Sequence, residues 1–211
     1  PGLNDRQHAM ARRTELHARN TELDAAISLS QDLLDSAETL RDTDPTTYGQ
    51  VMINHGILRV AGGEYELGLS IIERGMEFLE ARTNPFDEIL TNSIMAKGIC
   101  QLLLGSLTDA KDTFRRAQHI THRHKGVYNK EQLPMISYLA ATNLRQGNSL
   151  AADQQQRFSL KVAEQSYGPN SIEILPMLSS LGSYFASRGD TISLAAATEF
   201  RLLRSILFRD A

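Results

Sequence analysis

Histidine and arginine side chains gather in one segment, FRRAQHITHRHKG (114–126), whose residue types could do chemistry. His119 and His122 share one face if the segment is helical, and His124 is close by. A metal site would need a third ligand, preferably a carboxylate, and none is local, so this is the weakest interpretation. The second interpretation is that the basic residues near the end of a helix complement its dipole. The third is a patch for an anion or an acidic partner. That patch would consist of Arg115, Arg116, His119, His122 and Arg123.

Other catalytic signatures are absent from the sequence. It contains no phosphate-binding glycine loop, nucleophile elbow, HExxH zinc pair or CxxC motif, and its single cysteine is Cys100. We therefore expect a protein that is not an enzyme and that needs no cofactor and no metal.

Composition and charge exclude further classes of protein. The chain of 211 residues is 41% hydrophobic and has a formal charge of −3, which argues against a general nucleic-acid binder. Its apolar runs are much shorter than the ~20 residues of a membrane helix, so we expect a soluble protein without membrane insertion. The chain begins at Pro1, from which we expect a processed or excised piece. This start slightly favours an exported, periplasmic bacterial protein over a cytoplasmic one.

Glycines recur with a period of 42 residues. Gly63, Gly105, Gly147 and Gly189 are evenly spaced, and the tripeptide Leu-Pro-Met occurs at Pro134 and again 42 positions later. Three further series of small residues follow the same period. They are Gly56, Gly98, Ala140 and Gly182; Ala26, Gly68, Ala110 and Ala152; and Gly75, Ala117 and Ser159. The repeat predicts one domain over 1–211, with residues 1–6 leading into units at about 7–48, 49–90, 91–132, 133–174 and 175–211.

Each unit has the pattern of two helices around its turn glycine. Small residues such as Gly56 and Gly68 are expected where the two helices cross closely. Phe114 is expected to fill the gap between units. Asn129 is a candidate N-cap, with Gln132 at capping-box spacing. Pro134 then predicts a late or loosened helix start, as Pro176 does in the next unit.

This pattern resembles the tetratricopeptide repeat. In that family a small residue, a turn glycine and two alanines define a helix–turn–helix unit, which Gly98, Gly105, Ala110 and Ala117 match here. The period of 42 residues is similar to the longer repeats of kinesin light chains. The resemblance implies an all-α, right-handed α-solenoid of about five repeats and about ten antiparallel helices.

The resemblance also implies a concave groove lined by the first helix of each unit. The residues that would line it, and bind a partner, are Gln50, Ile53, Ile57, Val60, Asn92, Met95, Ile99, Leu102, Ser137 and Ala141. Chaperone-binding members clamp a terminal carboxylate with a set of lysine, arginine and asparagine residues, and the repeated asparagine of that set is replaced in this chain. A mostly apolar groove fits an amphipathic helix or an extended peptide better. The leading hypothesis is thus a non-enzymatic scaffold or adaptor that binds a protein or peptide.

The alternative hypothesis is an assembly or docking module of a longer chain. Residues 20–90 carry a net charge of −10 and residues 91–165 a net charge of +5, which would suit head-to-tail stacking or a charged partner. The last predicted helix carries more apolar residues than one packing face can bury. This helix would pack against a second copy in a homodimer, or against sequence missing from this piece of the chain. The residues that would form the contact are Phe200, Leu203, Ile206 and Leu207.

Overall fold

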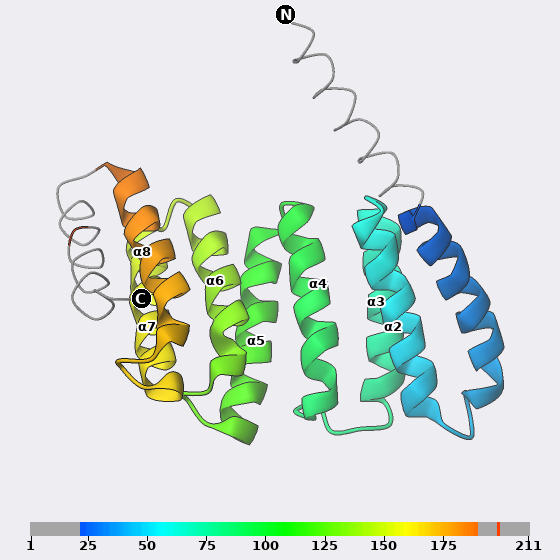
Figure 1. The fold of residues 1–211 in the computed structure, drawn as a ribbon. Coiled ribbons are helices and arrows are strands. Elements are labelled where there is room, and N and C mark those ends of the chain that lie inside the picture. The colour runs from blue at the N-terminus through cyan, green and yellow to red at the C-terminus, as the bar shows by residue number, and fades with distance from the viewer. Residues whose placement is uncertain (1–21, 190–197, 199–211) are drawn as a thin grey trace, which may run out of the picture. The chain divides into compact units, whose positions relative to one another are not determined.

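The computed structural model describes residues 22–189 and Thr198. The predicted C-terminal association face, Phe200, Leu203, Ile206 and Leu207, lies outside the described residues, as does the first predicted helix of the first unit. Within residues 22–189 all regular secondary structure is helical, in agreement with the all-α prediction (Figure 1).

Long helices alternate with short 3₁₀ turns along the chain. Residues 22–37 form the first described helix. The others are η1 (Glu38–Leu40), α2 (Pro45–Ala61), α3 (Tyr65–Glu80), η2 (Glu88–Leu90), α4 (Thr91–Leu103), α5 (Leu107–Lys125), η3 (Lys130–Gln132), α6 (Leu133–Arg145), α7 (Ser149–Tyr167), η4 (Ile172–Ile174) and α8 (Leu175–Arg188). The period of 42 residues is visible in the starts of α4, α6 and α8 and in those of α3, α5 and α7.

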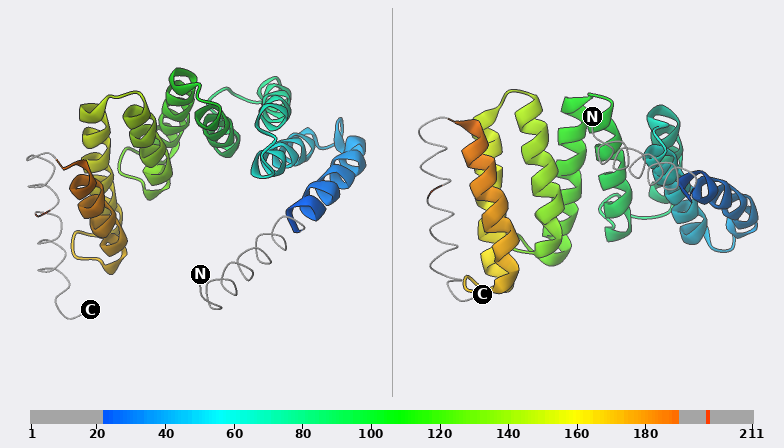
Figure 2. Two further views of the ribbon diagram at one scale, coloured as in Figure 1. Left: turned by 90° about the horizontal axis from the view of Figure 1, so that it is seen from above. Right: turned by 45° about the horizontal axis from the view of Figure 1, so that its top comes forward.

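The contacts divide the chain into two compact units, Pro1–Thr113 and Phe114–Ala211, with the boundary inside α5. In the first unit, α2 packs against α3, and α4 packs against both. In the second unit, α7 packs against α6 and also contacts α8, and Figure 2 shows these helices as neighbours in two further views.

The turn glycines adopt the conformation that the sequence pattern requires. Gly63, Gly105, Gly147 and Gly189 have φ between 70° and 87°, a left-handed region in which side chains other than glycine are strained. Each ends the first helix of a unit, as predicted. A second series, Gly126 and Gly168, ends the second helices with φ of 84° and 95°, and the repeat pattern does not predict it.

The two helices of the second repeat touch through glycines. A Cβ atom added at Gly56 would lie 2.8 Å from Ile72 Cγ1 and 2.9 Å from the Gly68 carbonyl oxygen. One added at Gly68 would overlap Val60 Cγ2 and lie 2.8 Å from the Gly56 oxygen. The expected close crossing is therefore present, and it brings α2 and α3 together backbone to backbone.

The helices that follow the interunit loops start late, as the prolines predict. Asn129 accepts a hydrogen bond from Glu131 N at 2.8 Å and so begins the 3₁₀ turn η3, after which α6 starts with Pro134 in its first turn. Ser171 and Pro176 repeat this arrangement before α8. A proline costs no hydrogen bond there, because the first N–H groups of a helix have no partner within it.

Gln132 does not complete a capping box with Asn129. Its side chain is fully buried, donates to the Val127 carbonyl oxygen and accepts from Gln118 Nε2 at 3.0 Å. The capping-box interpretation is therefore wrong for this residue, which instead binds the loop after α5 to the helix itself.

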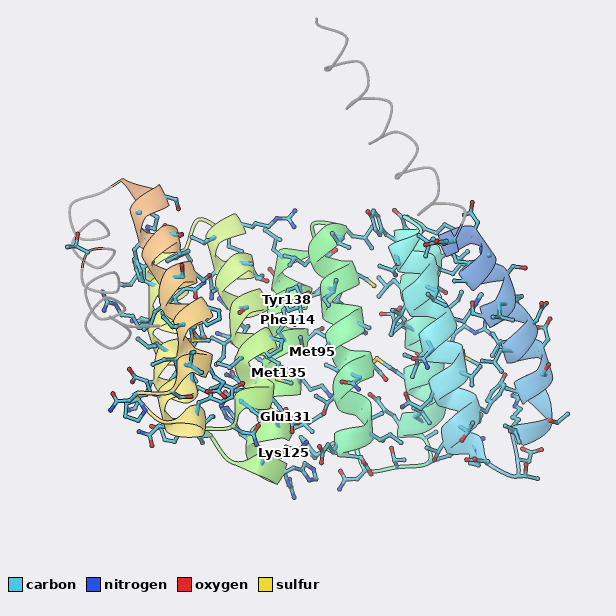
Figure 3. All side chains as sticks on the ribbon, viewed as in Figure 1. Met95, Phe114, Lys125, Glu131, Met135 and Tyr138 are labelled. Carbon is cyan, nitrogen blue, oxygen red and sulfur yellow. The ribbon has the colours of Figure 1, made fainter. Side chains whose placement is uncertain are left out.

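Phe114 fills the space between successive repeats in the second unit. Its side chain is fully buried on α5 and stacks on Tyr138 of α6, with ring centroids 5.1 Å apart and planes 12° apart. Figure 3 shows the two rings together between their helices. The predicted role of Phe114 is confirmed.

Candidate functional site

An apolar pocket of about 240 Å³ opens between α2, α3 and α4 of the first unit. We call it the groove pocket. Its lining consists of Ile57, Val60, Ile72, Asn92, Met95, Ala96, Ile99 and Cys100. Asn92 is the only side chain among these that carries a polar amide, and it is exposed. The pocket can therefore hold an apolar group beside one hydrogen-bonding side chain.

The structure brings together half of the residues that the sequence predicts for the groove. Five line the groove pocket, namely Ile57, Val60, Asn92, Met95 and Ile99. Gln50, on the same helix as Ile57, is half-buried and donates through Nε2 to the Ile89 carbonyl oxygen at 3.4 Å. Ser137 is exposed and Ala141 half-buried on α6, in the second unit.

Two predicted groove residues are buried instead. Ile53 is 1% exposed, and its side chain fills the space where Gly75 lacks one. Leu102 is 8% exposed in the last turn of α4. Neither can contact a partner without a change of fold, so both are removed from the candidate surface.

Three pocket residues are not among those that the sequence predicts. Ala96 and Cys100 follow Asn92 at steps of four residues, so helical spacing alone could have placed them on its face of α4. Ile72 comes from α3, which the sequence pattern assigns to packing. Burial raises the pKa of the Cys100 thiol to about 11. The pocket wall therefore presents an uncharged thiol, in keeping with its apolar character.

The basic segment of α5 is partly structural. His122, Arg123, His124 and Lys125 occupy its last turn, where positive charge complements the helix dipole. His122 Nε2 lies 2.7 Å from Gln132 Oε1, so this histidine holds the η3 turn. Arg115, His119 and Arg123 are exposed and Arg116 is half-buried. Among the described residues, no three His, Cys, Asp or Glu side chains gather as a metal site requires.

A buried histidine in the first unit is not singled out by its sequence. His55 is 2% exposed and accepts a hydrogen bond at Nε2 from Arg59 Nε at 3.3 Å. Its Nδ1 lies 2.7 Å from Ser30 Oγ, and that hydroxyl donates to the Ile27 carbonyl oxygen at 2.7 Å. Nδ1 therefore carries the proton of a neutral imidazole. Burial, and then the charge of Arg59, lower the pKa of His55.

This network predicts a loss of stability in mild acid. A histidine with a lowered folded pKa contributes stability above its unfolded pKa of about 6.5, and that stability is lost as the pH falls below this value. We expect the wild-type free energy of unfolding to fall below pH 6.5, by at most about 1.4 kcal/mol per pH unit from this group. Urea unfolding of wild type and His55→Gln from pH 5 to pH 8 measures it. The difference between the two slopes isolates His55 from the other histidines, and equal slopes would contradict the assignment.

Comparison of the sequence with protein-family models gives no match, and comparison with curated proteins gives none. Solved structures do match. One is BtubC (BKLC) from P. vanneervenii, with 15% identity and a TM-score of 0.69, covering 90% of this chain and 74% of that one. Another is a putative kinesin light chain of Podosopora anserina with nearly identical TPR-like repeats, with 14% identity and a TM-score of 0.75. That match covers 98% of this chain and 97% of the other. A variant of the same protein matches with the same TM-score and covers 98% of this chain and 96% of its own.

These matches and the helix pairs above define the fold as an all-α solenoid of tetratricopeptide-like repeats. The spacing of 42 residues is compatible with the kinesin-light-chain type of these repeats. Within the described residues, no helix combines the length and apolar character needed to cross a bilayer.

Proposed function

We propose that this chain is a non-enzymatic scaffold that binds a protein or peptide segment at the groove pocket. The observation that carries the proposal is an open, almost wholly apolar pocket, five of whose eight lining residues stand at the repeat positions expected to face the groove. An apolar hollow beside a single amide suits a bulky apolar side chain whose backbone receives a hydrogen bond from Asn92. The partner is therefore an amphipathic helix or an extended peptide with one large apolar anchor.

Further support comes from the two isoleucines of the pocket. Ile57 on α2 is 37% exposed although it is aliphatic, and Ile99 on α4 is half-buried. A partner that covers them would remove apolar surface from water, at about 25 cal/mol per Å². The lack of catalytic motifs in the sequence supports a role in binding instead of chemistry.

The test is a selection of linear peptides displayed on phage against the wild-type chain, followed by affinity measurements on the selected peptides. We expect Ile57→Glu with Ile99→Glu to weaken binding by about 100-fold or more, because two carboxylates would have to be buried against an apolar anchor. Circular dichroism should stay unchanged, since neither side chain is fully buried.

A matched control is Leu67→Glu with Leu103→Glu. These leucines are 47% and 48% exposed on α3 and α4, and they do not line the groove pocket. The control makes the same charge change and should leave peptide affinity within about twofold. Peptides that bind the pocket double variant as tightly as wild type, or a selection that yields no binders, would refute the proposal.

A further inference from the structure

The helix at 22–37 keeps an exposed apolar face at the start of the first unit. Leu29 and Leu33 stand one turn apart on it and are 69% and 55% exposed, and Ala25, one turn earlier, is exposed as well. We call these three residues the Leu33 face. We propose that residues 7–20 of a second copy of the chain cover the Leu33 face, so that two copies exchange this segment in a two-fold dimer. The face shares no residue with the groove pocket, so the inference is independent of the proposed function.

The second repeat shows what such a face contacts. Gly75 stands 42 residues after Leu33, is buried on α3 and lies against α2, the first helix of its own repeat. A Cβ atom added at Gly75 would lie 2.6 Å from Ile53 Cγ1. By the same period, the first helix of the first repeat falls within residues 7–20, which lie outside the described residues. The Leu33 face therefore stands where the first helix of a repeat packs.

Residues 7–20 match the Leu33 face in the size of their side chains. Ala11 stands 42 residues before Ile53, as Leu33 does before Gly75. The large residue of this contact is thus on the first helix in the second repeat and on the second helix in the first repeat. A small alanine opposite a leucine fills the space as an isoleucine opposite a glycine does, which close packing between two helices requires.

Charge also favours this segment as the occupant. The helix at 22–37 holds four acidic side chains and no lysine or arginine, a net charge of −4, and residues 7–20 hold three arginines and one glutamate, a net charge of +2. Glu22 and Asp32 are exposed and border the Leu33 face, seven residues before Leu29 and one before Leu33. Opposite charges at the edge of an apolar contact guide association and fix its register.

Thr21 favours a second copy over the same copy. The first helix of each later repeat ends at a glycine with φ between 70° and 87°, at Gly63, Gly105, Gly147 and Gly189. Thr21 stands 42 residues before Gly63, and a β-branched residue is strained at such a φ. Residues 7–20 would need this turn to fold back onto the helix at 22–37 of their own copy. On a second copy they make the same contacts without it.

The first experiment is disulfide cross-linking of the full chain with Cys100→Ala, Ala11→Cys and Leu33→Cys, followed by electrophoresis without reductant. The equivalent pair, Ile53 and Gly75, is close enough for a disulfide. We expect a product of twice the mass of the chain, because position 11 of one copy bonds to position 33 of the other. A mixture of two chains, one with Ala11→Cys and one with Leu33→Cys, should give the same covalent dimer. A cross-link within one chain, or no cross-link, would overturn the proposal.

The second experiment is sedimentation equilibrium of the wild-type chain and of matched variants, with circular dichroism to check that each is folded. Thr21→Gly should weaken dimerisation about tenfold or more, because glycine allows the turn within one copy, whereas Thr21→Ala should change it by less than about threefold. Leu33→Glu should abolish the dimer, and the same change at Leu150, which is 71% exposed on α7, should leave it intact. A wild-type chain that stays monomeric at high micromolar concentration, or equal dimerisation of Thr21→Gly and Thr21→Ala, would refute the exchange.

Discussion

Replacing Gly68 by leucine should lower the free energy of unfolding by about 3 kcal/mol or more. The Cβ atom alone would overlap Val60 Cγ2 and approach the Gly56 carbonyl oxygen to 2.8 Å. The second of these contacts is with backbone, which cannot move aside as the end of a side chain can. The two helices would have to separate along their length, and the packing of α2 on α3 would be lost with them.

Urea unfolding followed by circular dichroism measures this effect. Glu66→Leu is the control, because it adds leucine two residues earlier on the same helix at an exposed position. It should change stability by no more than about 0.5 kcal/mol. Equal stabilities of the two variants would show that the helices do not cross at Gly68.

Phe114→Ala should cost about 3–5 kcal/mol, because it removes a fully buried ring and leaves a cavity between α5 and α6. The side chain is 0% exposed, so the cavity that it leaves would be buried and closed to water. The stacking with Tyr138 would also be lost, and such ring pairs contribute beyond their buried area.

The matched control is Tyr138→Phe, which keeps the stacked ring and removes only its hydroxyl. Its effect should be below about 1 kcal/mol, and thermal unfolding of both variants decides between the outcomes. A Phe114→Ala protein as stable as the control would mean that the ring does not fill the space between the repeats.

The repeat makes much of this fold predictable. Gly105 and Gly147 are recognisable because only glycine adopts a positive φ without strain, and a turn of fixed geometry must recur at a fixed spacing. Pro134 and Pro176 are informative for the related reason that proline restricts its own position within a helix. These residues have local requirements, so their meaning can be found in the sequence alone.

The errors concern residues whose role depends on packing. Ile53 and Ile57 are both isoleucines one turn apart on α2, yet the first is buried against Gly75 and the second lies at the groove pocket. The spacing of apolar residues cannot tell the buried isoleucine from the one at the pocket, because a helix inside a repeat array carries apolar residues on more than one face. Gln132 stands at capping-box spacing but finds partners in the preceding helix, a contact that helix-start patterns do not include.

The hollow of about 450 Å³ between the helix at 22–37, η1, α2 and α3, which Asp35, Glu38 and Arg74 help to line, is not predictable from the sequence for a further reason. Its carboxylates lie at and just before η1, whereas Arg74 comes from α3, and no motif joins them in the sequence. Here the register also departs from the repeat, since α2 begins at Pro45 behind an N-cap at Asp44, four residues before the expected start of its unit. Such a hollow depends on how one pair of successive units meets and not on the repeat itself.

The 3₁₀ turns η2 and η3 have a consequence for the evolution of the gene. Leu90 ends one and Gln132 ends the other, and each is followed at once by the first residue of a long helix. Loss of residues 91–132 would therefore join Leu90 to Leu133 through a turn that already exists. Duplication of the same residues would join Gln132 to Thr91, again where a 3₁₀ turn meets the start of a long helix. Unequal recombination could then lengthen or shorten the protein by whole repeats of 42 residues without requiring a new junction. Selection acting on such a gene would change the length of the array in discrete steps, while point mutations adjust each repeat separately.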